Sequence, residues 1–243
     1  MCSVQNGKML TRKEISPYLL RTANLFEGQA KEYIIEKTFG KHLLELQWIL
    51  KNCGENGKIV DVGGGLGVNL ITLKSINNSL DVYLVDKFEE YEGLNSEENP
   101  MGSAEQGLNV LKQYGVNVVV DDFWAKKKLP FDSGYFDIVT CFDVIEHFTQ
   151  NPLPLLREMK RILKNGGIFI MCAPNLLSTA RRSSMMLGMH PYMHFNMWMC
   201  EKYDKYYGHY REYTRKEYRI LLERSGFSTI NTFMVSEPTR TKA

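Results

Sequence analysis

The chain has 243 residues, of which 44% are apolar, and a formal net charge of +2. That apolar content supports a buried core and excludes a disordered chain, while the near-neutral charge gives no sign of a nucleic-acid partner. The five cysteines are odd in number and form no C-x-x-C pair, so we expect a reducing, cytoplasmic compartment rather than a disulfide framework or a zinc knuckle.

No apolar run approaches the roughly 20 residues that a membrane-spanning helix needs. The sequence therefore predicts no integral membrane segment and leaves peripheral contact with a membrane open. It does not indicate an oligomeric state.

Helical and strand patterns alternate along the chain. Residues 1–26 are mixed in character and are predicted to form an N-terminal arm, and residues 27–52 are predicted to be helical with a division at Gly40. Strands are predicted, in chain order, at residues 58–62, 80–85, 116–120, 136–141, 168–172 and 227–235. Further helices are predicted at residues 67–75, 103–114 and 214–225, and around residues 155–163 with an end at Asn165-Gly166-Gly167.

This alternation is typical of βαβ units with a parallel sheet, and the apolar strands suit burial on both faces. The sequence thus predicts an α/β fold, a doubly wound, mostly parallel, Rossmann-like sheet with flanking helices. We expect one domain over residues 1–243, with an insertion rich in methionine and aromatic residues at 175–213, after the fifth strand.

A glycine-rich loop directly follows the first predicted strand and opens a helix, the place where a doubly wound sheet binds nucleotides. It contains Asp61, Gly63, Gly64, Gly65 and Gly67. The dinucleotide pattern G-x-G-x-x-G fails here, because its last position holds Val68 or Leu70.

Asp86 ends the next strand, where a carboxylate can accept hydrogen bonds from both hydroxyls of a ribose. The alternative interpretation is a tight turn with a helix-capping aspartate. The agreement of strand, glycines and acid favours a nucleotide-like cofactor.

Residues 55–175 resemble the class I S-adenosylmethionine (SAM)-dependent methyltransferases, through the loop from Val60 to Gly67, Asp86 and the run Asp121-Asp122-Phe123. The segments 129–137 and 141–147 are also similar to that family. The resemblance implies that SAM is the cofactor. It implies these cofactor-binding residues: Asp61, Gly63, Gly64, Gly65, Gly67, Asp86, Lys87, Asp122, Phe123, Cys141, Phe142 and Asp143.

The family usually ends with two paired strands after the last helix, and here the pattern predicts one, at 227–235. A missing strand, a miscounted strand and a shortened chain remain alternatives.

His147 is the candidate general base, because a histidine accepts a proton near neutral pH and this one follows a cofactor-site strand. A structural histidine that holds the loop by hydrogen bonds is the alternative. Asp143, Glu146 and His147 also offer ligand types that suit a divalent cation, but we predict no metal.

His209, Tyr210, Arg211 and Tyr213 are candidate substrate-binding residues, since an arginine fork can hold a carboxylate or phosphate. These four resemble a segment of a small-molecule methyltransferase subgroup, and packing of a loop is the alternative. Residues 185–199 hold six of the 12 methionines. We interpret them as a lid over an apolar acceptor, with a loosely packed core flap as the alternative.

The sequence therefore predicts an enzyme that transfers a methyl group from SAM to a small molecule, with a hydroxyl of a sugar, a lipid-linked or a secondary-metabolite intermediate as the first choice of acceptor. A SAM-binding protein without turnover and an NAD(P)-dependent oxidoreductase are the alternatives. Oxygen, nitrogen and carbon acceptors are not distinguished.

Overall fold

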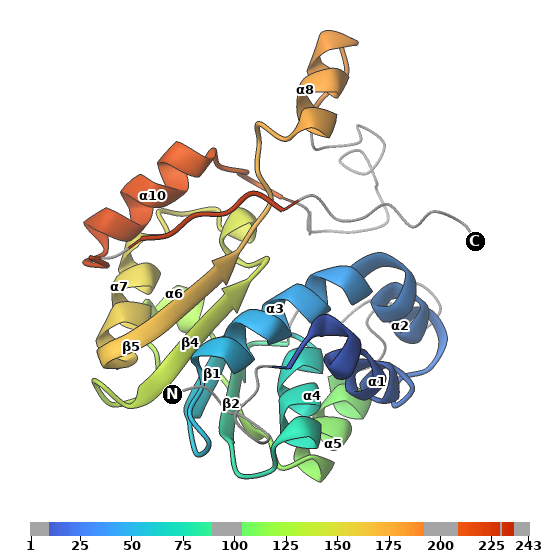
Figure 1. The fold of residues 1–243 in the computed structure, drawn as a ribbon. Helices are drawn as coiled ribbons and strands as arrows, with labels where there is room; N and C mark the ends of the chain where they lie inside the picture. The colour runs from blue at the N-terminus through green and yellow to red at the C-terminus, as the bar shows by residue number, and fades with distance from the viewer. Residues whose placement is uncertain (1–9, 89–103, 192–208, 229, 236–243) are drawn as a thin grey trace.

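A five-stranded, all-parallel sheet in the order β3-β2-β1-β4-β5 forms the centre of the molecule (Figure 1). The computed structural model describes residues 10–88, 104–191, 209–228 and 230–235. The strands are β1 (Lys58–Val62), β2 (Asp81–Asp86), β3 (Asn117–Val120), β4 (Phe136–Phe142) and β5 (Leu163–Cys172). The strand order reverses between β1 and its neighbour β4, and such a reversal creates a crevice at the carboxyl ends of the strands.

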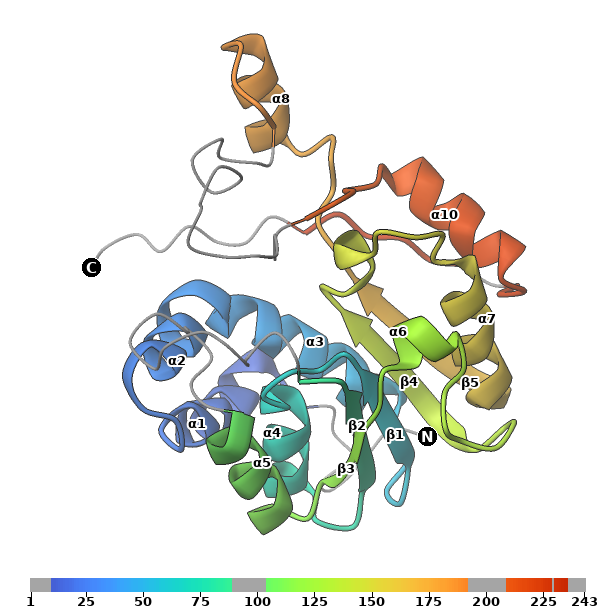
Figure 2. The same ribbon diagram turned by 180° about the vertical axis from the view of Figure 1, so that it is seen from behind.

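Helices cover both faces of the sheet, as Figures 1 and 2 show, so the predicted doubly wound fold is confirmed. One face carries α1 (Arg12–Ala23), α3 (Phe39–Asn52), α4 (Val68–Ile76) and α5 (Ala104–Gln113). The other carries α6 (Phe123–Lys126), α7 (Leu153–Ile162) and α10 (Arg215–Arg224). A hydrophobic core lies on each face of the sheet, and successive residues of a strand point to opposite faces. Ile59 packs in the first core and Val60 in the second.

The predicted N-terminal arm is wrong for the part that the structure describes, because α1 is an integral part of the core. Ile15 and Leu19 are fully buried, and Thr72 of α4 donates a hydrogen bond to Thr22 over 2.9 Å. The apolar residues recur every four positions, which is the spacing of one helix face. Thr11 begins the helix with a capping box.

Leu19→Ala is expected to lower the free energy of unfolding by about 2–5 kcal/mol, because it leaves a cavity in a closed core. Leu20→Ala is the matched control, since Leu20 is 44% exposed on the same helix. It should change the stability by no more than about 0.5 kcal/mol. Urea denaturation measures both, and equal effects would mean that α1 is not a core helix.

The predicted division of the next helical region at Gly40 is also wrong. The chain forms α2 (Gly28–Glu32), a π-helical stretch η1 (Tyr33–Thr38) and then α3, with Gly40 inside α3. The irregularity lies before Gly40, where the Thr38 hydroxyl donates to the carbonyl oxygen of Tyr33 at 3.4 Å. Side-chain bonds to the backbone compete with helical ladder bonds.

The predicted helix end at Asn165-Gly166-Gly167 is wrong, because α7 ends at Ile162 and these residues lie within β5. Gly166 has a φ of +78°, and the pairing of β5 with β4 shifts register between Phe136 and Ile138. A glycine with positive φ allows the local change in backbone direction that a β-bulge requires.

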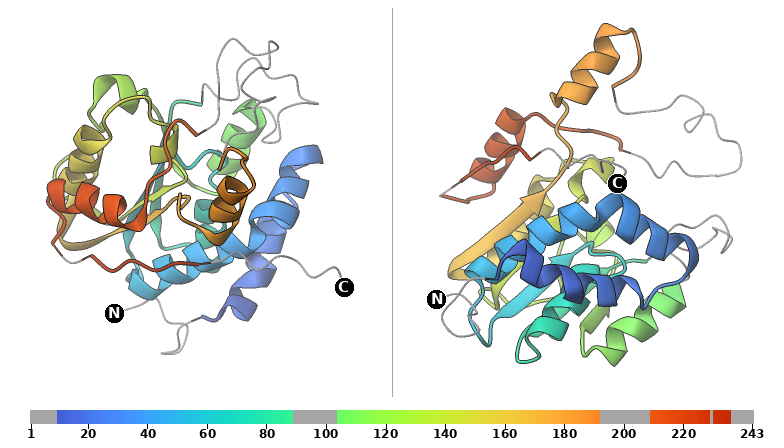
Figure 3. Two further views of the ribbon diagram at one scale, coloured as in Figure 1. Left: turned by 90° about the horizontal axis from the view of Figure 1, so that it is seen from above. Right: turned by 45° about the vertical axis from the view of Figure 1, so that its right-hand side comes forward.

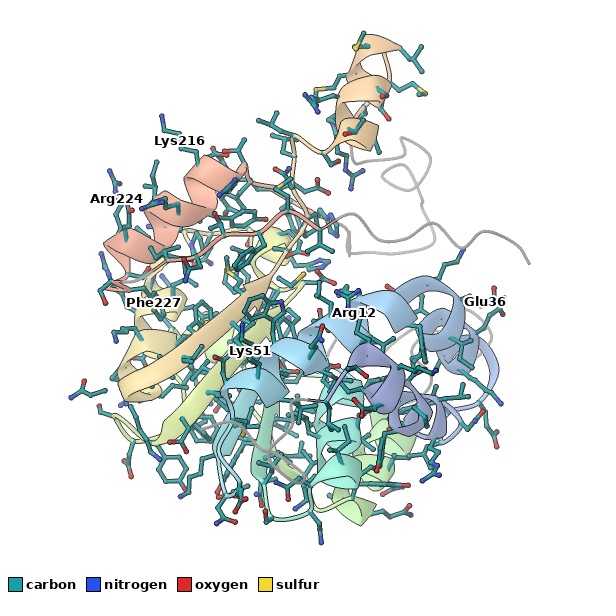
Figure 4. All side chains as sticks on the ribbon, in the orientation of Figure 1. Arg12, Glu36, Lys51, Lys216, Arg224 and Phe227 are labelled. Atoms are coloured by element: carbon teal, nitrogen blue, oxygen red, sulfur yellow. The ribbon has the colours of Figure 1, made fainter. Side chains whose placement is uncertain are left out.

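The final strand predicted at 227–235 is not found among the described residues of that range. Phe227 instead stacks on Phe169 of β5, with ring centroids 4.8 Å apart, and Phe233 stacks on Trp48 of α3 at 5.1 Å. Figure 4 labels Phe227, and it shows Lys216 and Arg224 on the outer side of α10. Aromatic packing, rather than a strand ladder, therefore holds this segment.

The insertion after β5 begins with α8 (Thr179–Met186), which stands away from the sheet in Figure 1 and in the right-hand view of Figure 3. Met186 is 88% exposed there. Residues 192–208, which carry the rest of the predicted methionine-rich lid, lie outside the described residues. Among the described helices, none combines the length and apolar character needed to cross a membrane.

Candidate functional site

The glycine loop follows β1 at the carboxyl edge of the sheet, where the strand order reverses between β1 and β4. The Gly63 amide donates to the Val85 carbonyl oxygen at 2.8 Å, and the Gly67 amide donates to the Gly64 carbonyl oxygen at 2.9 Å. Gly63, Gly65 and Gly67 have φ values of +75°, +54° and +63°. Three left-handed residues in five positions require glycine, and they let the main chain turn tightly before α4.

Gly64 is required for a different reason, because it lies directly on two side chains. A β-carbon on Gly64 would come within 2.4 Å of Asp61 Oδ2 and 2.6 Å of Leu84 Cδ1. The loop therefore packs directly on the side chains of β1 and β2.

Asp61 supports this loop from below. Its Oδ1 accepts a hydrogen bond of 2.7 Å from the Thr140 hydroxyl, and the residue is 3% exposed. Burial raises the pKa of Asp61 to about 6, and the negative charges of Glu45 and Asp86 act in the same direction. Thr140 is opposite Asp61 in the parallel register of β1 and β4. Thr140 is a polar residue within an apolar strand, and this pattern in the sequence could have indicated its role.

Asp61→Asn is expected to change how stability depends on pH. A carboxyl whose pKa rises from 3.8 to about 6 on folding is protonated more easily in the folded state. The wild type therefore loses stability as the pH rises from about 4 to about 6, by up to about 3 kcal/mol, and the variant does not. Urea denaturation at about pH 4.5 and about pH 7.5 should show that the stability of the variant relative to the wild type increases with pH.

Asp132→Asn, at an exposed position, is the control and should leave the pH dependence unchanged. Identical pH profiles for wild type and Asp61→Asn would contradict the prediction.

Asp86 joins the loop to the end of β2. Its Oδ2 accepts from the Gly65 amide at 3.0 Å, and its Oδ1 accepts from the Phe88 amide at 2.9 Å. Burial raises the pKa of Asp86, and these amide bonds oppose that rise. The structure thus brings the predicted acid directly to the predicted loop, and the ribose-binding role stays a prediction.

Of the two predicted residues after β3, Asp122 caps a helix and Phe123 packs in the core. Asp122 caps α6, with its Oδ1 accepting from the Ala125 amide at 3.0 Å, and Phe123 is 1% exposed within the core. Lys87 lies over the ring of Trp124, with Nζ 5.1 Å from the centroid. Trp124, which the sequence analysis missed, is half-buried and its indole Nε1 has no hydrogen-bond partner among the described residues. Trp124 therefore presents an aromatic surface beside Asp122 and Lys87.

The residues at the end of β4 lie beside the glycine loop. Cys141 is fully buried, which raises the pKa of its thiol, so its side chain packs in the core. Phe142 is half-buried, and Asp143 has a φ of +51° and forms an ion pair with Lys41 of α3. A β-carbon on Gly63 would lie 2.7 Å from Val144 Cγ2, so the segment that follows β4 packs against the glycine loop.

A buried polar network on α3 and α4 lies behind the loop, and the sequence analysis missed it. His42 Nδ1 is 3.2 Å from Glu45 Oε2 and 3.1 Å from Asn69 Oδ1, and the Asn69 amide donates to Glu45 Oε2 at 2.8 Å. With Lys41, these residues connect the helical layer to the loop and to Asp143. The spacing of Lys41, His42 and Glu45 on α3 is that of any polar helix face, so only the tertiary packing identifies them as a network.

His147 lies in the short helix η3 (Ile145–His147) after β4 and meets His209 from the far end of the insertion. The two rings pack edge to face, with centroids 5.0 Å apart. Glu146 is fully buried, its two carboxylate oxygens have no hydrogen-bond partner among the described residues, and burial raises its pKa. Glu146, His147 and His209 bring ligand atoms within 4.8 Å of one another. The absence of a metal stays a prediction.

The four candidate substrate-binding residues separate in the structure. His209 reaches His147. Arg211 is exposed and donates to Glu217 Oε1 at 2.9 Å, Tyr210 is 46% exposed, and Tyr213 is buried in the core beside Tyr218. The arginine fork therefore holds a carboxylate of the protein itself, as a packed loop would.

The chain matches the family model described as a methyltransferase domain over residues 34–232. It is 30% identical over 151 residues to the ubiquinone biosynthesis O-methyltransferase of Glaesserella parasuis, which covers 61% of this chain and 52% of that protein. The chain spans about half the length of the curated relatives it matches.

Solved structures share the fold at lower sequence identity. One is from the complex between the Haloferax volcanii Trm112 methyltransferase activator and a methyltransferase, with a TM-score of 0.55 and 18% identity over 86% of this chain and 75% of that chain. Another is phosphoethanolamine N-methyltransferase 2 of Haemonchus contortus in complex with S-adenosyl-L-methionine, with a TM-score of 0.52 and 18% identity over 89% of this chain and 41% of that chain.

Proposed function

The chain belongs to the class I SAM-dependent methyltransferases, and from this premise we propose that it binds SAM at the glycine loop and transfers its methyl group to a hydroxyl of a small molecule. The observation that carries the cofactor site is the bond between Asp86 Oδ2 and the Gly65 amide at 3.0 Å. It joins an acid to a glycine-rich main chain at the carboxyl edge of the sheet. Those are the two features that a nucleoside with two ribose hydroxyls requires.

The residues present fit this cofactor. Asp86 would accept from the ribose, the main chain of the loop from Gly63 to Gly67 would lie against the remainder, and Asp122, Lys87 and Trp124 would hold the adenine side. Phe123 and Cys141 contribute by packing beneath these groups, as their burial indicates. Asp61 would contribute by supporting the loop, since its carboxylate lies against Gly64.

SAM supplies an electrophilic methyl group on a sulfonium, so the protein contributes orientation and electrostatics. Holding the acceptor oxygen in line with the methyl group accounts for up to about 7–11 kcal/mol of a barrier. A hydroxyl acceptor also has to lose its proton, which a general base assists by roughly 10²–10⁴-fold. The histidines beside the loop offer that base. The ubiquinone-biosynthetic relative, named as an O-methyltransferase, supports an oxygen acceptor.

The proposal is tested first by isothermal titration of the chain with SAM, with S-adenosylhomocysteine and with NADH. Binding of the first two and not of NADH is expected. The reverse result would replace the methyltransferase proposal with the oxidoreductase alternative.

A second experiment incubates the chain with SAM and a panel of hydroxyl compounds: a catechol, a phenol, a hexose and a glycerol-based lipid headgroup. Mass spectrometry then follows S-adenosylhomocysteine and the methylated product together. Turnover of an amine panel and not of the hydroxyl panel would correct the acceptor class, and SAM binding without any turnover would favour a binding protein.

A further inference from the structure

His209 is held by a buried carboxylate. Its Nδ1 lies 2.7 Å from Glu212 Oε1, and the Glu212 side chain has no exposed surface. The same Oε1 accepts from Arg181 Nη2 at 2.7 Å. A carboxylate at Nδ1 keeps the proton of a neutral imidazole on that nitrogen, so Nε2 becomes the basic nitrogen.

This pair adjoins the proposed cofactor loop. The Glu146 carbonyl oxygen accepts from the Tyr210 amide at 2.8 Å and from the Arg211 amide at 3.1 Å, which docks the 209–213 segment on η3. The His147 amide in turn donates to the Val144 carbonyl oxygen at 3.1 Å, and Val144 lies against Gly63. Two residues, His147 and Val144, therefore connect His209 to the glycine loop through these three contacts.

We propose that His209 is the general base of the methyl transfer and that buried Glu212 is its positioning residue, in place of the His147 predicted from sequence. This inference rests on the proposed function. Nε2 takes the proton of the acceptor hydroxyl as the oxygen attacks the methyl carbon and the bond from that carbon to the sulfonium sulfur breaks. The products are the methyl ether, S-adenosylhomocysteine and a protonated His209, which returns its proton to water.

The charges around His209 come from every element that packs against it. Glu146 and His147 face it from η3, Glu212 from its own segment, and Arg181 from α8 through Glu212. Arg181 Nη1 also donates to the Pro191 carbonyl oxygen at 2.6 Å. The start of the insertion is thereby tied to the same carboxylate that orients the histidine, and the edge-to-face contact with His147 fixes the plane of the His209 ring.

The test compares His209→Gln and Glu212→Gln with the wild type, using the hydroxyl compound of the panel that gives the highest turnover. His209→Gln should lower kcat by roughly 10²–10⁴-fold. It should also remove the acid limb of the pH–rate profile and leave the affinity for SAM within about threefold. Glu212→Gln should lower kcat by roughly 10–100-fold, as loss of an orienting partner does. Glu223→Gln, the same change at an exposed pair on α10, is the matched control and should leave turnover unchanged.

Nitrogen-15 NMR of the imidazoles gives a readout that needs no acceptor. At neutral pH the wild-type His209 should carry its proton on Nδ1, and Glu212→Gln should shift the balance between the two tautomers. Thermal melts of both variants establish that each is folded.

Three results would overturn the proposal: a kcat of His209→Gln within threefold of the wild type, an unchanged acid limb, or a His209 proton on Nε2. Loss of wild-type turnover on chelation, with recovery on adding Mg²⁺ or Zn²⁺, would also overturn it, because His209 would then be a ligand. If the wild type binds SAM and methylates nothing in either panel, the proposed function and the catalytic role of His209 both fail. The tautomer measurement still reports whether the pair with Glu212 exists.

Discussion

Gly64→Ala is expected to remove measurable SAM binding and to lower the free energy of unfolding by about 1–3 kcal/mol. The added β-carbon would lie 2.4 Å from Asp61 Oδ2 and 2.6 Å from Leu84 Cδ1. Neither atom can move freely, because Thr140 holds Asp61 and Leu84 is fully buried in β2. The loop itself must therefore shift.

A shifted loop carries the Gly65 amide away from Asp86 and spoils the surface that the cofactor contacts. Loss of about 3 kcal/mol of binding energy corresponds to a dissociation constant more than 100-fold larger. Isothermal titration with SAM and urea denaturation measure the two effects separately.

Gly54→Ala is the matched control, since a β-carbon added at Gly54 would have no atom within 4 Å and the residue has no positive φ. It should bind SAM like the wild type, with a stability change within about 0.5 kcal/mol. A Gly64→Ala variant that binds SAM within threefold of the wild type would show that the cofactor does not lie on this loop.

Asp86→Asn is expected to weaken SAM binding by roughly 10²–10³-fold, because hydrogen bonds to a charged acceptor contribute about 1.5–3 kcal/mol each. The wild-type carboxylate already accepts from the amides of Gly65 and Phe88, one on each oxygen. An asparagine has one oxygen, so its NH₂ group must face one of these amides, and its capacity to accept from ribose hydroxyls falls. The same titration measures the effect, with S-adenosylhomocysteine as the second ligand.

Asp132→Asn, the same change at an exposed aspartate, is again the matched control and should leave SAM affinity unchanged. An affinity of Asp86→Asn close to that of the wild type, with the fold intact by circular dichroism, would mean that the ribose is bound elsewhere.

The central architecture could be predicted because its signals are local. A parallel strand buried on both faces is a continuous apolar run, and the loop from Gly63 to Gly67 combines glycines with a strand before it and a helix after it. Asp86 ends the following strand, and the parallel pairing of β1 with β2 places it beside that loop. The sequence by itself therefore determined the sheet and the cofactor class, and it predicted the cofactor residues.

The tertiary structure decided whatever depends on contacts between distant segments. Burial made α1 a core helix, because its apolar face meets α4, and no local pattern states which faces meet. The same is true of Thr140 beneath Asp61, of Lys41 beside Asp143, and of Glu212, whose partners His209 and Arg181 come from opposite ends of the insertion. The sequence named two histidines, and only the packing of the insertion brought the buried carboxylate of Glu212 to Nδ1 of His209.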